Sequence, residues 1–129
     1  MADKPTIVVA TNNPGKLKEF ALLLPNFKII SQSSLNISPE EELSETFFEN
    51  SLQKARVANN ASGMVSLGDD SGLIVPALNN LPGLRSARYA HENATDEENR
   101  QHLRKELEAQ DLNQAKAYKN CVLVLVQAS

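Results

Sequence analysis

Two adjacent carboxylates between glycines are the strongest sign of chemistry in this sequence. Asp69 and Asp70 follow the short apolar run 65–67 and lie within the segment Gly68–Gly72. The apolar run predicts a brief strand, and ligands of α/β sheets gather at the carboxyl ends of strands. One of the two aspartates could bind Mg²⁺ and orient or deprotonate a water molecule, while Ser71 hydrogen-bonds a phosphate oxygen. The alternative is a structural Asp-Asp-Ser-Gly turn.

A glycine-containing turn, Thr11–Lys16, stands between a predicted strand and a predicted helix. Such a turn presents backbone N–H groups to an anion, and the helix dipole adds a favourable potential. Lys16 supplies a cation for a polyphosphate, and the side-chain amides of Asn12 and Asn13 can donate hydrogen bonds to phosphate or sugar oxygens. The spacing of a Walker A loop is missing. The alternative is an ordinary Asn-Pro-Gly turn with a solvated lysine.

The acidic segment Glu40–Glu42, with Glu45 and Glu49, is a third candidate. Carboxylates near the start of a helix commonly do no more than complement the helix dipole. One of them could instead ligate Mg²⁺, a hard ion that takes oxygen ligands and is held by one or two carboxylates plus substrate phosphate.

The remaining polar candidates are weaker. Arg88 could pair with phosphate or with an acidic side chain, or it could anchor its loop. His91 and His102 are expected at the surface. Cys121 lies in an apolar run and is expected to be a buried, inert thiol.

Strands that alternate with helices must position these residues, which predicts an α/β fold. The expected strands are 6–10, 27–30, 65–67, 73–75 and 121–126, and the expected helices are 16–24, 41–61 and 96–109. The inner side of the helix 41–61 is expected to carry Phe47, Phe48, Leu52, Ala55 and Ala58. Thr95 and Glu98 fit a capping box for the last helix. The unbroken apolar run 121–126 is typical of a strand covered on both faces.

The composition excludes several classes of partner. The chain has 129 residues, of which 41% are hydrophobic, so a single domain over 1–129 can bury a core. With 13 Lys+Arg against 16 Asp+Glu, the net charge is −3, and no nucleic-acid polymer is expected as a partner. No apolar run approaches the roughly 18 residues that cross a bilayer, so no membrane partner is expected and the localisation should be cytoplasmic. A lone cysteine excludes an intrachain disulfide.

Taken together, these segments resemble the inosine/xanthosine triphosphate pyrophosphatases, which hydrolyse deaminated purine nucleotides. The matching segments are Ala10–Lys16, Glu45–Asn50, Lys54–Arg56, Asp69–Leu73, Pro82–Tyr89, Ala94–Asn99 and Cys121–Val124. The resemblance covers nearly the whole chain in the family's order. It implies an α/β fold, with a mixed sheet and packed helices, like the N-terminal part of the family's fold. We expect the chain to lack the family's C-terminal part, which carries the residues that recognise the base.

The resemblance also implies roles for individual residues. The triphosphate-binding loop would comprise Thr11, Asn12, Asn13, Pro14, Gly15 and Lys16. Asp70 would be the catalytic carboxylate and a Mg²⁺ ligand, and Lys16 would stabilise charge on the leaving pyrophosphate. Ser71 would contact the substrate. The second metal ligand would be Glu41, with Glu42 as the alternative one position along.

The implied reaction is Mg²⁺-dependent hydrolysis of ITP, dITP or XTP to the monophosphate and pyrophosphate, and the implied assembly is a homodimer. The alternative is a non-catalytic, truncated family member that binds nucleotide or only self-associates. A pyrophosphatase for other modified nucleotides also stays open.

Overall fold

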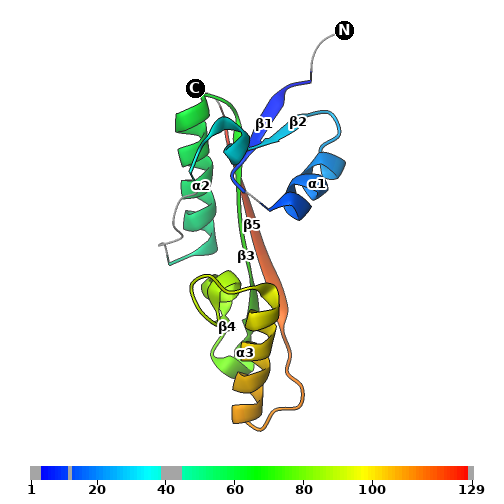
Figure 1. Cartoon of the computed structure of the whole chain (residues 1–129), viewed down its shortest axis with the longest axis vertical. Helices are drawn as coiled ribbons and strands as arrows, with labels where there is room; N and C mark the ends of the chain where they lie inside the picture. Colours follow the sequence, from blue (N-terminus) through cyan, green and yellow to red (C-terminus); the bar gives the residue numbers. More distant parts are fainter. Residues whose placement is uncertain (1–3, 12, 39–44, 128–129) are drawn as a thin grey trace. The chain divides into compact units, whose positions relative to one another are not determined.

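The structure, a computed structural model (Figure 1), describes residues 4–11, 13–38 and 45–127. In chain order the strands and α-helices are β1 (Thr6–Val9), α1 (Pro14–Leu23), β2 (Lys28–Ser31), α2 (Phe47–Ser62), β3 (Ser66–Val75), β4 (Leu81–Pro82), α3 (Asp96–Ala109) and β5 (Tyr118–Val126). Three 3₁₀ helices join them: η1 (Gln32–Leu35), η2 (Pro76–Leu78) and η3 (Gly83–Arg88). The α/β fold with a mixed sheet is therefore confirmed.

The chain divides into two compact units. The first comprises Met1–Asp70 and Val122–Ser129, and the second comprises Ser71–Cys121. Strands β3 and β5 each contribute residues to both units. The expectation of a single domain over 1–129 stays a prediction.

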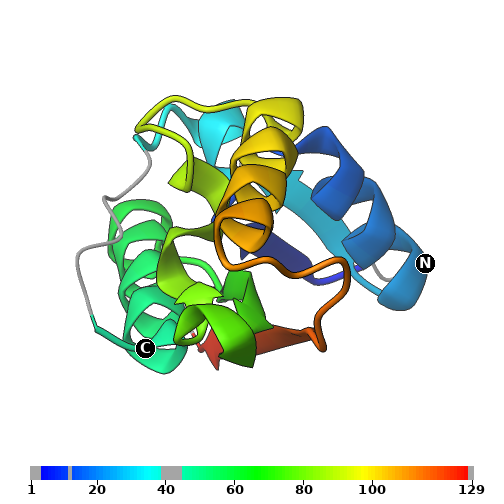
Figure 2. The same cartoon turned by 90° about the horizontal axis from the view of Figure 1, so that it is seen from below.

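The first unit is built on parallel strand pairs. β1 pairs with β2 from Thr6↔Lys28 to Val9↔Ser31 and with β3 at Val8↔Ser66 and Val9↔Leu67. Alternate residues of β1 face opposite sides, so the strand forms two cores. One core gathers Ile7, Val9, Phe20 and Leu67, and the other gathers Val8, Ala10 and Ala58. Helices α1 and α2 therefore cover opposite sides of β1, as Figures 1 and 2 show.

Helix α2 packs against β3 through small residues. Its buried positions are Asn50, Ser51, Ala55 and Ala58, whereas Phe48, expected on the inner side, is 55% exposed. The reason is a close backbone approach: a Cβ atom added to Gly68 would lie 2.1 Å from the carbonyl oxygen of Ser51. No large side chain fits between the two backbones. Of the helix expected over 41–61, residues 41–44 lie outside the described residues, and α2 begins at Phe47, capped by Thr46.

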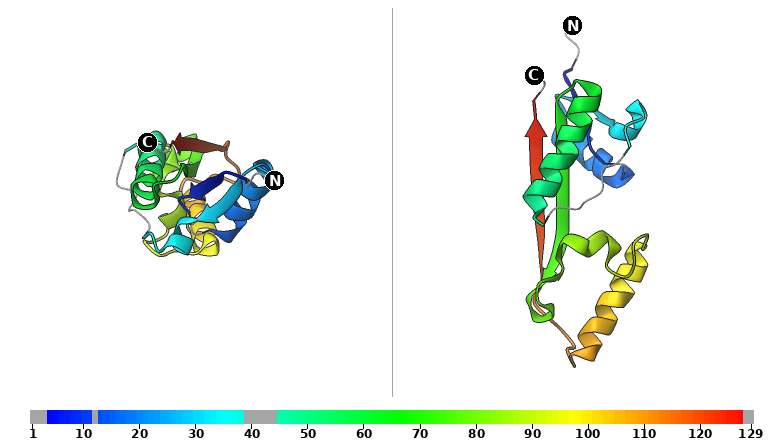
Figure 3. Two further views of the ribbon diagram at one scale, coloured as in Figure 1. Left: turned by 90° about the horizontal axis from the view of Figure 1, so that it is seen from above. Right: turned by 90° about the vertical axis from the view of Figure 1, so that its left-hand side faces the viewer.

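Strand β3 joins the two short strands expected at 65–67 and 73–75 into one, and the alternative of a structural turn at 68–72 is wrong. It runs without interruption from Ser66 to Val75, and its first five residues are all buried. β1 and β4 pair with its two ends and β5 also pairs with it, so the ladder extends through the glycines. Figure 3 shows β3 and β5 side by side.

Strand β5 is half exposed rather than covered on both faces. Its residues alternate between exposed and half-buried from Asn120 onward. Leu123 and Leu125 are 53% and 52% exposed, and Cys121, expected to be buried, is also exposed. β5 is also tied to α2, where the Ser51 hydroxyl donates to the backbone carbonyl of Val122 at 2.9 Å.

The second unit is a short hairpin with a capped helix. β3 pairs antiparallel with β4 at Ile74↔Pro82 and Val75↔Leu81. Helix α3 has the predicted bounds and the predicted capping box of Thr95 and Glu98. Among the described residues, α3 included, no helix has the length and hydropathy to cross a membrane.

Candidate functional site

Strand β3 places Asp69 and Asp70 just beyond the stretch Ser66–Leu67 that pairs with β1. Both aspartates are buried, with 3% and 4% of their surface exposed. Successive strand residues face opposite sides of a sheet. Asp69 accordingly contacts a residue of α1, and Asp70 contacts a residue of α2. The two adjacent carboxylates therefore have different partners on different helices. This separation follows from the alternation of a strand and would not be expected in a turn.

Asp69 is paired with Lys16. The Lys16 ammonium lies 2.6 Å from Asp69 Oδ2, and the side chains are 33% and 5% exposed. A buried carboxylate requires such a partner, because desolvating an unpaired charge is costly. Lys54 of α2 adds a second cation, since its Nζ donates to the Asp69 carbonyl oxygen at 3.0 Å. The pair leaves a third of the lysine accessible to an anion.

Asp70 accepts a hydrogen bond from a neutral group. The side-chain nitrogen of Asn50 donates to Asp70 Oδ2 at 3.0 Å, and the bond is buried. An amide orients a carboxylate without neutralising its charge. A buried carboxylate held in one orientation is suited to bind a cation or to accept a proton from water.

The turn before α1 is capped by its own asparagine. Asn13 Oδ1 accepts from the backbone N–H groups of Gly15 at 2.9 Å and Lys16 at 3.3 Å, and the Asn13 N–H donates to Thr11 Oγ1 at 3.2 Å. These amides were expected to be available to an anion. The cap satisfies them, as an N-cap side chain does, so an anion has to displace the Asn13 side chain to reach them. Pro14 begins the helix, and Asn12 lies outside the described residues.

The other expected site residues are placed as follows. Ser71 is half-buried and is the first residue of the second unit. Glu41 and Glu42 lie outside the described residues, and Glu45 and Glu49 are exposed. Within the described ranges, no three His, Cys, Asp or Glu side chains gather where they could hold a metal ion. The structure therefore pairs Lys16 with Asp69, places the adjacent Asp70 against Asn50 of α2, and leaves the second metal ligand untested.

The two histidines belong to the second unit. His91 Nε2 lies 2.5 Å from Glu98 Oε2, and this bond, with the backbone bond from Thr95, lowers the pKa of the Glu98 carboxyl to about 2. His102 meets the edge of the Tyr89 ring at a centroid distance of 4.6 Å. Burial, together with Glu106, raises the pKa of Tyr89. His91 is exposed as expected, whereas His102 is half-buried.

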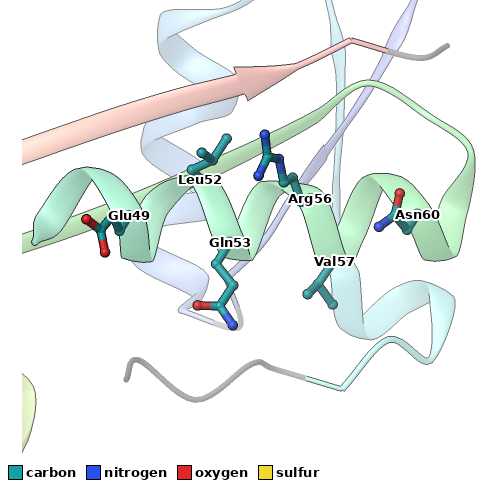
Figure 4. Close-up of a pocket in the computed structure, with 6 residues that line it drawn as sticks. All are labelled: Glu49, Leu52, Gln53, Arg56, Val57 and Asn60. Atoms are coloured by element: carbon teal, nitrogen blue, oxygen red, sulfur yellow. The ribbon is translucent and has the colours of Figure 1, made fainter. Parts of the chain in front are cut away.

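A hollow on α2 is separate from the buried aspartates. It has a volume of about 310 Å³ and is lined by Glu49, Leu52, Gln53, Arg56, Val57 and Asn60 (Figure 4). All six residues come from one helix. With one carboxylate and one guanidinium, its lining shows no constellation for acid–base or metal chemistry.

Sequence reasoning missed two features of the candidate site. It did not identify Asn50 as a partner of Asp70, and it did not identify Asp69 as the ion-pair partner of Lys16. Asn50 was visible as a polar residue in a helix, three positions after Phe47 and four before Lys54, which puts all three on one side of α2. A polar residue within a predicted core face is the signal that could have identified it.

The first unit thus defines an α/β protein in which Lys16 and Asp69 pair just beyond the carboxyl end of the parallel strand β1. Residues 7–129 match the Ham1 family, and the chain belongs to this family. The resemblance inferred from the motifs is confirmed.

Named relatives and solved structures agree with this assignment. The dITP/XTP pyrophosphatase of Haemophilus influenzae is 48% identical over 126 residues, which are 95% of this chain and 64% of that protein. The enzyme of the same name from Shigella flexneri is 43% identical and matches 94% of this chain and 62% of its own length. The HAM1 protein of Coxiella burnetii superposes with a TM-score of 0.86 at 41% identity, over 96% of this chain and 64% of that one. The chain therefore spans somewhat less than two thirds of the relatives it matches.

Proposed function

We propose that this chain is a Mg²⁺-dependent nucleoside triphosphate pyrophosphatase that hydrolyses dITP, ITP and XTP to the monophosphate and pyrophosphate. The observation that carries the proposal is the buried pair Asp69 and Asp70 just beyond the carboxyl end of β1, with Asp69 bonded to Lys16 of the turn that starts a helix. The relatives named as dITP/XTP pyrophosphatases supply the substrate class.

In this proposal each residue has a separate task. Asp70 accepts the proton of a water molecule whose oxygen attacks the α-phosphorus, and the bond from that phosphorus to the oxygen bridging to the β-phosphate breaks. Pyrophosphate leaves with the electron pair. Lys16, held by Asp69, stabilises the charge that builds up on it. Thr11, Asn13, Pro14 and Gly15 form the turn around the phosphates, together with Asn12, and Ser71 contacts the substrate.

The residues present are compatible with Mg²⁺. This ion is commonly held by one or two carboxylates plus substrate phosphates and water. Asp70 offers a buried carboxylate with a neutral amide donor, whereas Asp69 already has an ammonium partner. We assign Asp70 as one ligand and Glu41 as the second, with Glu42 as the alternative. When bound, the ion would neutralise phosphate charge and make the phosphorus more electrophilic.

The proposal extends to the setting of the enzyme. We propose a cytoplasmic homodimer that acts on free nucleotides, with neither a nucleic-acid polymer nor a membrane as partner. The net charge of −3 supports this choice, because a nucleic-acid-binding surface is strongly basic.

The test is pyrophosphate release from dITP, ITP, XTP and ATP with Mg²⁺, using the wild type and Asp70→Asn. We expect release that favours the deaminated purines and falls by at least 100-fold in the variant, because the amide can neither accept the proton nor hold the cation. The control is Glu19→Gln, which also replaces a carboxylate by its amide but lies on the exposed face of α1. It should keep full activity. Nucleotide binding without turnover by the folded wild type, or full activity in Asp70→Asn, would contradict the proposal.

A further inference from the structure

Asn50 is a buried amide at a position where a helix ordinarily carries an apolar residue. Only 2% of its surface is exposed, and it lies on the side of α2 that also buries Ser51, Ala55 and Ala58. Burying an amide costs free energy unless its donors and acceptor are satisfied. A role that needs an amide would explain why this position is not apolar.

The partner of this amide is the candidate catalytic carboxylate. Asn50 Nδ2 donates to Asp70 Oδ2 at 3.0 Å, across the contact between α2 and β3. The bond occupies one direction around Oδ2 and opposes rotation of the carboxylate about its χ2 angle. It therefore fixes how Asp70 presents its oxygens.

The backbones on both sides of this bond are held in register. Asn50 is next to Ser51, and Asp70 is two residues beyond Gly68, on the same side of β3. The Ser51 carbonyl and Gly68 approach so closely that an added Cβ would lie 2.1 Å from that oxygen. In addition, the Asn50 N–H donates to the Thr46 carbonyl at 3.1 Å in the first turn of the helix. The donor and acceptor thus come from elements that cannot shift independently.

The contrast with Asp69 shows what the amide contributes. Asp69 is bonded to an ammonium at 2.6 Å, which balances its charge. The amide of Asn50 brings no charge of its own, so this bond contributes direction to the Asp70 carboxylate rather than charge balance.

We propose that Asn50 is a positioning residue for Asp70: its amide holds the carboxylate in the orientation that binds the metal ion and accepts the proton of water. This inference rests on the role that the proposed function gives to Asp70. Groups that orient a metal ligand through a hydrogen bond typically contribute 10- to 100-fold in metal affinity or activity.

The test uses Asn50→Leu, which keeps the branched outline of the side chain and removes the donor, and Asn50→Ala, which removes the donor without adding bulk or charge. Each folded variant is titrated with Mn²⁺, and free Mn²⁺ is measured by electron paramagnetic resonance in the absence of nucleotide. We expect a loss of about 10- to 100-fold in Mn²⁺ affinity. With Mg²⁺ and dITP, we expect kcat to fall by a similar factor while the KM for nucleotide changes by less than about threefold.

Ser51→Ala is the matched control. Ser51 is equally buried, is adjacent on the same helix, and makes a structural bond to the Val122 carbonyl at 2.9 Å. We expect it to lower the free energy of unfolding and to leave Mn²⁺ affinity and kcat within about twofold of the wild type. Equal losses in Ser51→Ala and the Asn50 variants would overturn the positioning role, because general loosening of α2 would then explain both.

The outcomes separate this inference from the proposed function. If Asp70→Asn abolishes Mn²⁺ binding and turnover while both Asn50 variants retain them, only the positioning role is wrong. If the folded wild type neither binds Mn²⁺ nor releases pyrophosphate, the proposed function and the positioning role are both wrong.

Discussion

The buried pair of Lys16 and Asp69 shows how a side chain of the candidate site also stabilises the fold. Asp69 is 3% exposed, so its charge depends on the ammonium 2.6 Å away. Removing the lysine would leave a buried carboxylate whose loss of hydration is no longer offset. The same lysine thus serves stability and the proposed chemistry.

We expect Lys16→Met to lower the free energy of unfolding by about 1–3 kcal/mol, because a charged group is left without its ion-pair partner. Urea denaturation followed by circular dichroism measures this change. Lys18→Met, two positions along on the exposed side of α1, should change it by less than about 0.5 kcal/mol. Equal stability of the two variants would show that the Lys16–Asp69 pair does not contribute to folding.

At the residue scale, the sequence indicates the important types but not their partners. The Asp69–Asp70 pair and Lys16 were identified from motif and spacing. That Lys16 bonds Asp69 and that Asn50 bonds Asp70 depends on which side of β3 each aspartate faces. This could not be predicted while residues 68–72 were left outside the two expected strands, because only a strand imposes strict alternation.

The contact between α2 and β3 is the structural basis of the candidate site at the scale of elements. Small residues on the helix allow its backbone to approach Gly68, where any side chain would overlap the Ser51 carbonyl at 2.1 Å and the Ala55 nitrogen at 2.9 Å. Both neighbouring atoms belong to the backbone, so they cannot move aside as a flexible side chain would.

Gly68→Ala should therefore destabilise the fold by about 1–3 kcal/mol or more, since the extra methyl group forces the helix away from the strand. It should also lower turnover, because Asp70 is two residues away. The control is Gly15→Ala, whose added Cβ would meet only a side-chain atom, Asn13 Oδ1, at 3.2 Å. A smaller shift of the urea midpoint for Gly68→Ala than for Gly15→Ala would contradict this account of the contact.

Elements with strong local signals were predicted well. Helix α3, with its capping box, has the predicted bounds, and β1, α1 and β2 deviate by no more than two residues. The misplaced elements depend on tertiary contacts. β3 extends through two glycines because neighbouring strands pair with it, and Phe48 is exposed because α2 has no room for it against β3. Neither the strand pairing of β3 nor its packing against α2 can be predicted from the residues of one segment alone.

At the scale of the whole molecule, β5 presents an apolar face to solvent. Leu123 and Leu125 are about half exposed, whereas the valines that alternate with them are half-buried. An exposed apolar strand with a partner along one side is a template for pairing with another chain. The apolar run alone predicted a strand covered on both faces, because composition does not show what lies next to a strand.

We expect the double variant Leu123→Lys, Leu125→Lys to self-associate less than the wild type, since charges on an edge strand oppose pairing. Static light scattering as a function of protein concentration measures this, with a reductant present because Cys121 is exposed. Val124→Lys, on the half-buried face, should destabilise the fold instead. Identical scattering by the wild type and the double variant would show that this face does not drive association.

The first unit is discontinuous in the chain, and this has a consequence for synthesis on the ribosome. Its last segment begins at Val122, after the whole of the second unit. The Val122 carbonyl that accepts the Ser51 hydrogen bond follows Ser51 by 71 positions. At about 5–20 residues per second, it is made roughly 4–14 s later. The contiguous second unit can therefore assemble first. Helix α2, with Asn50 and Ser51 on its inner side, completes its packing only after β5 has been synthesised.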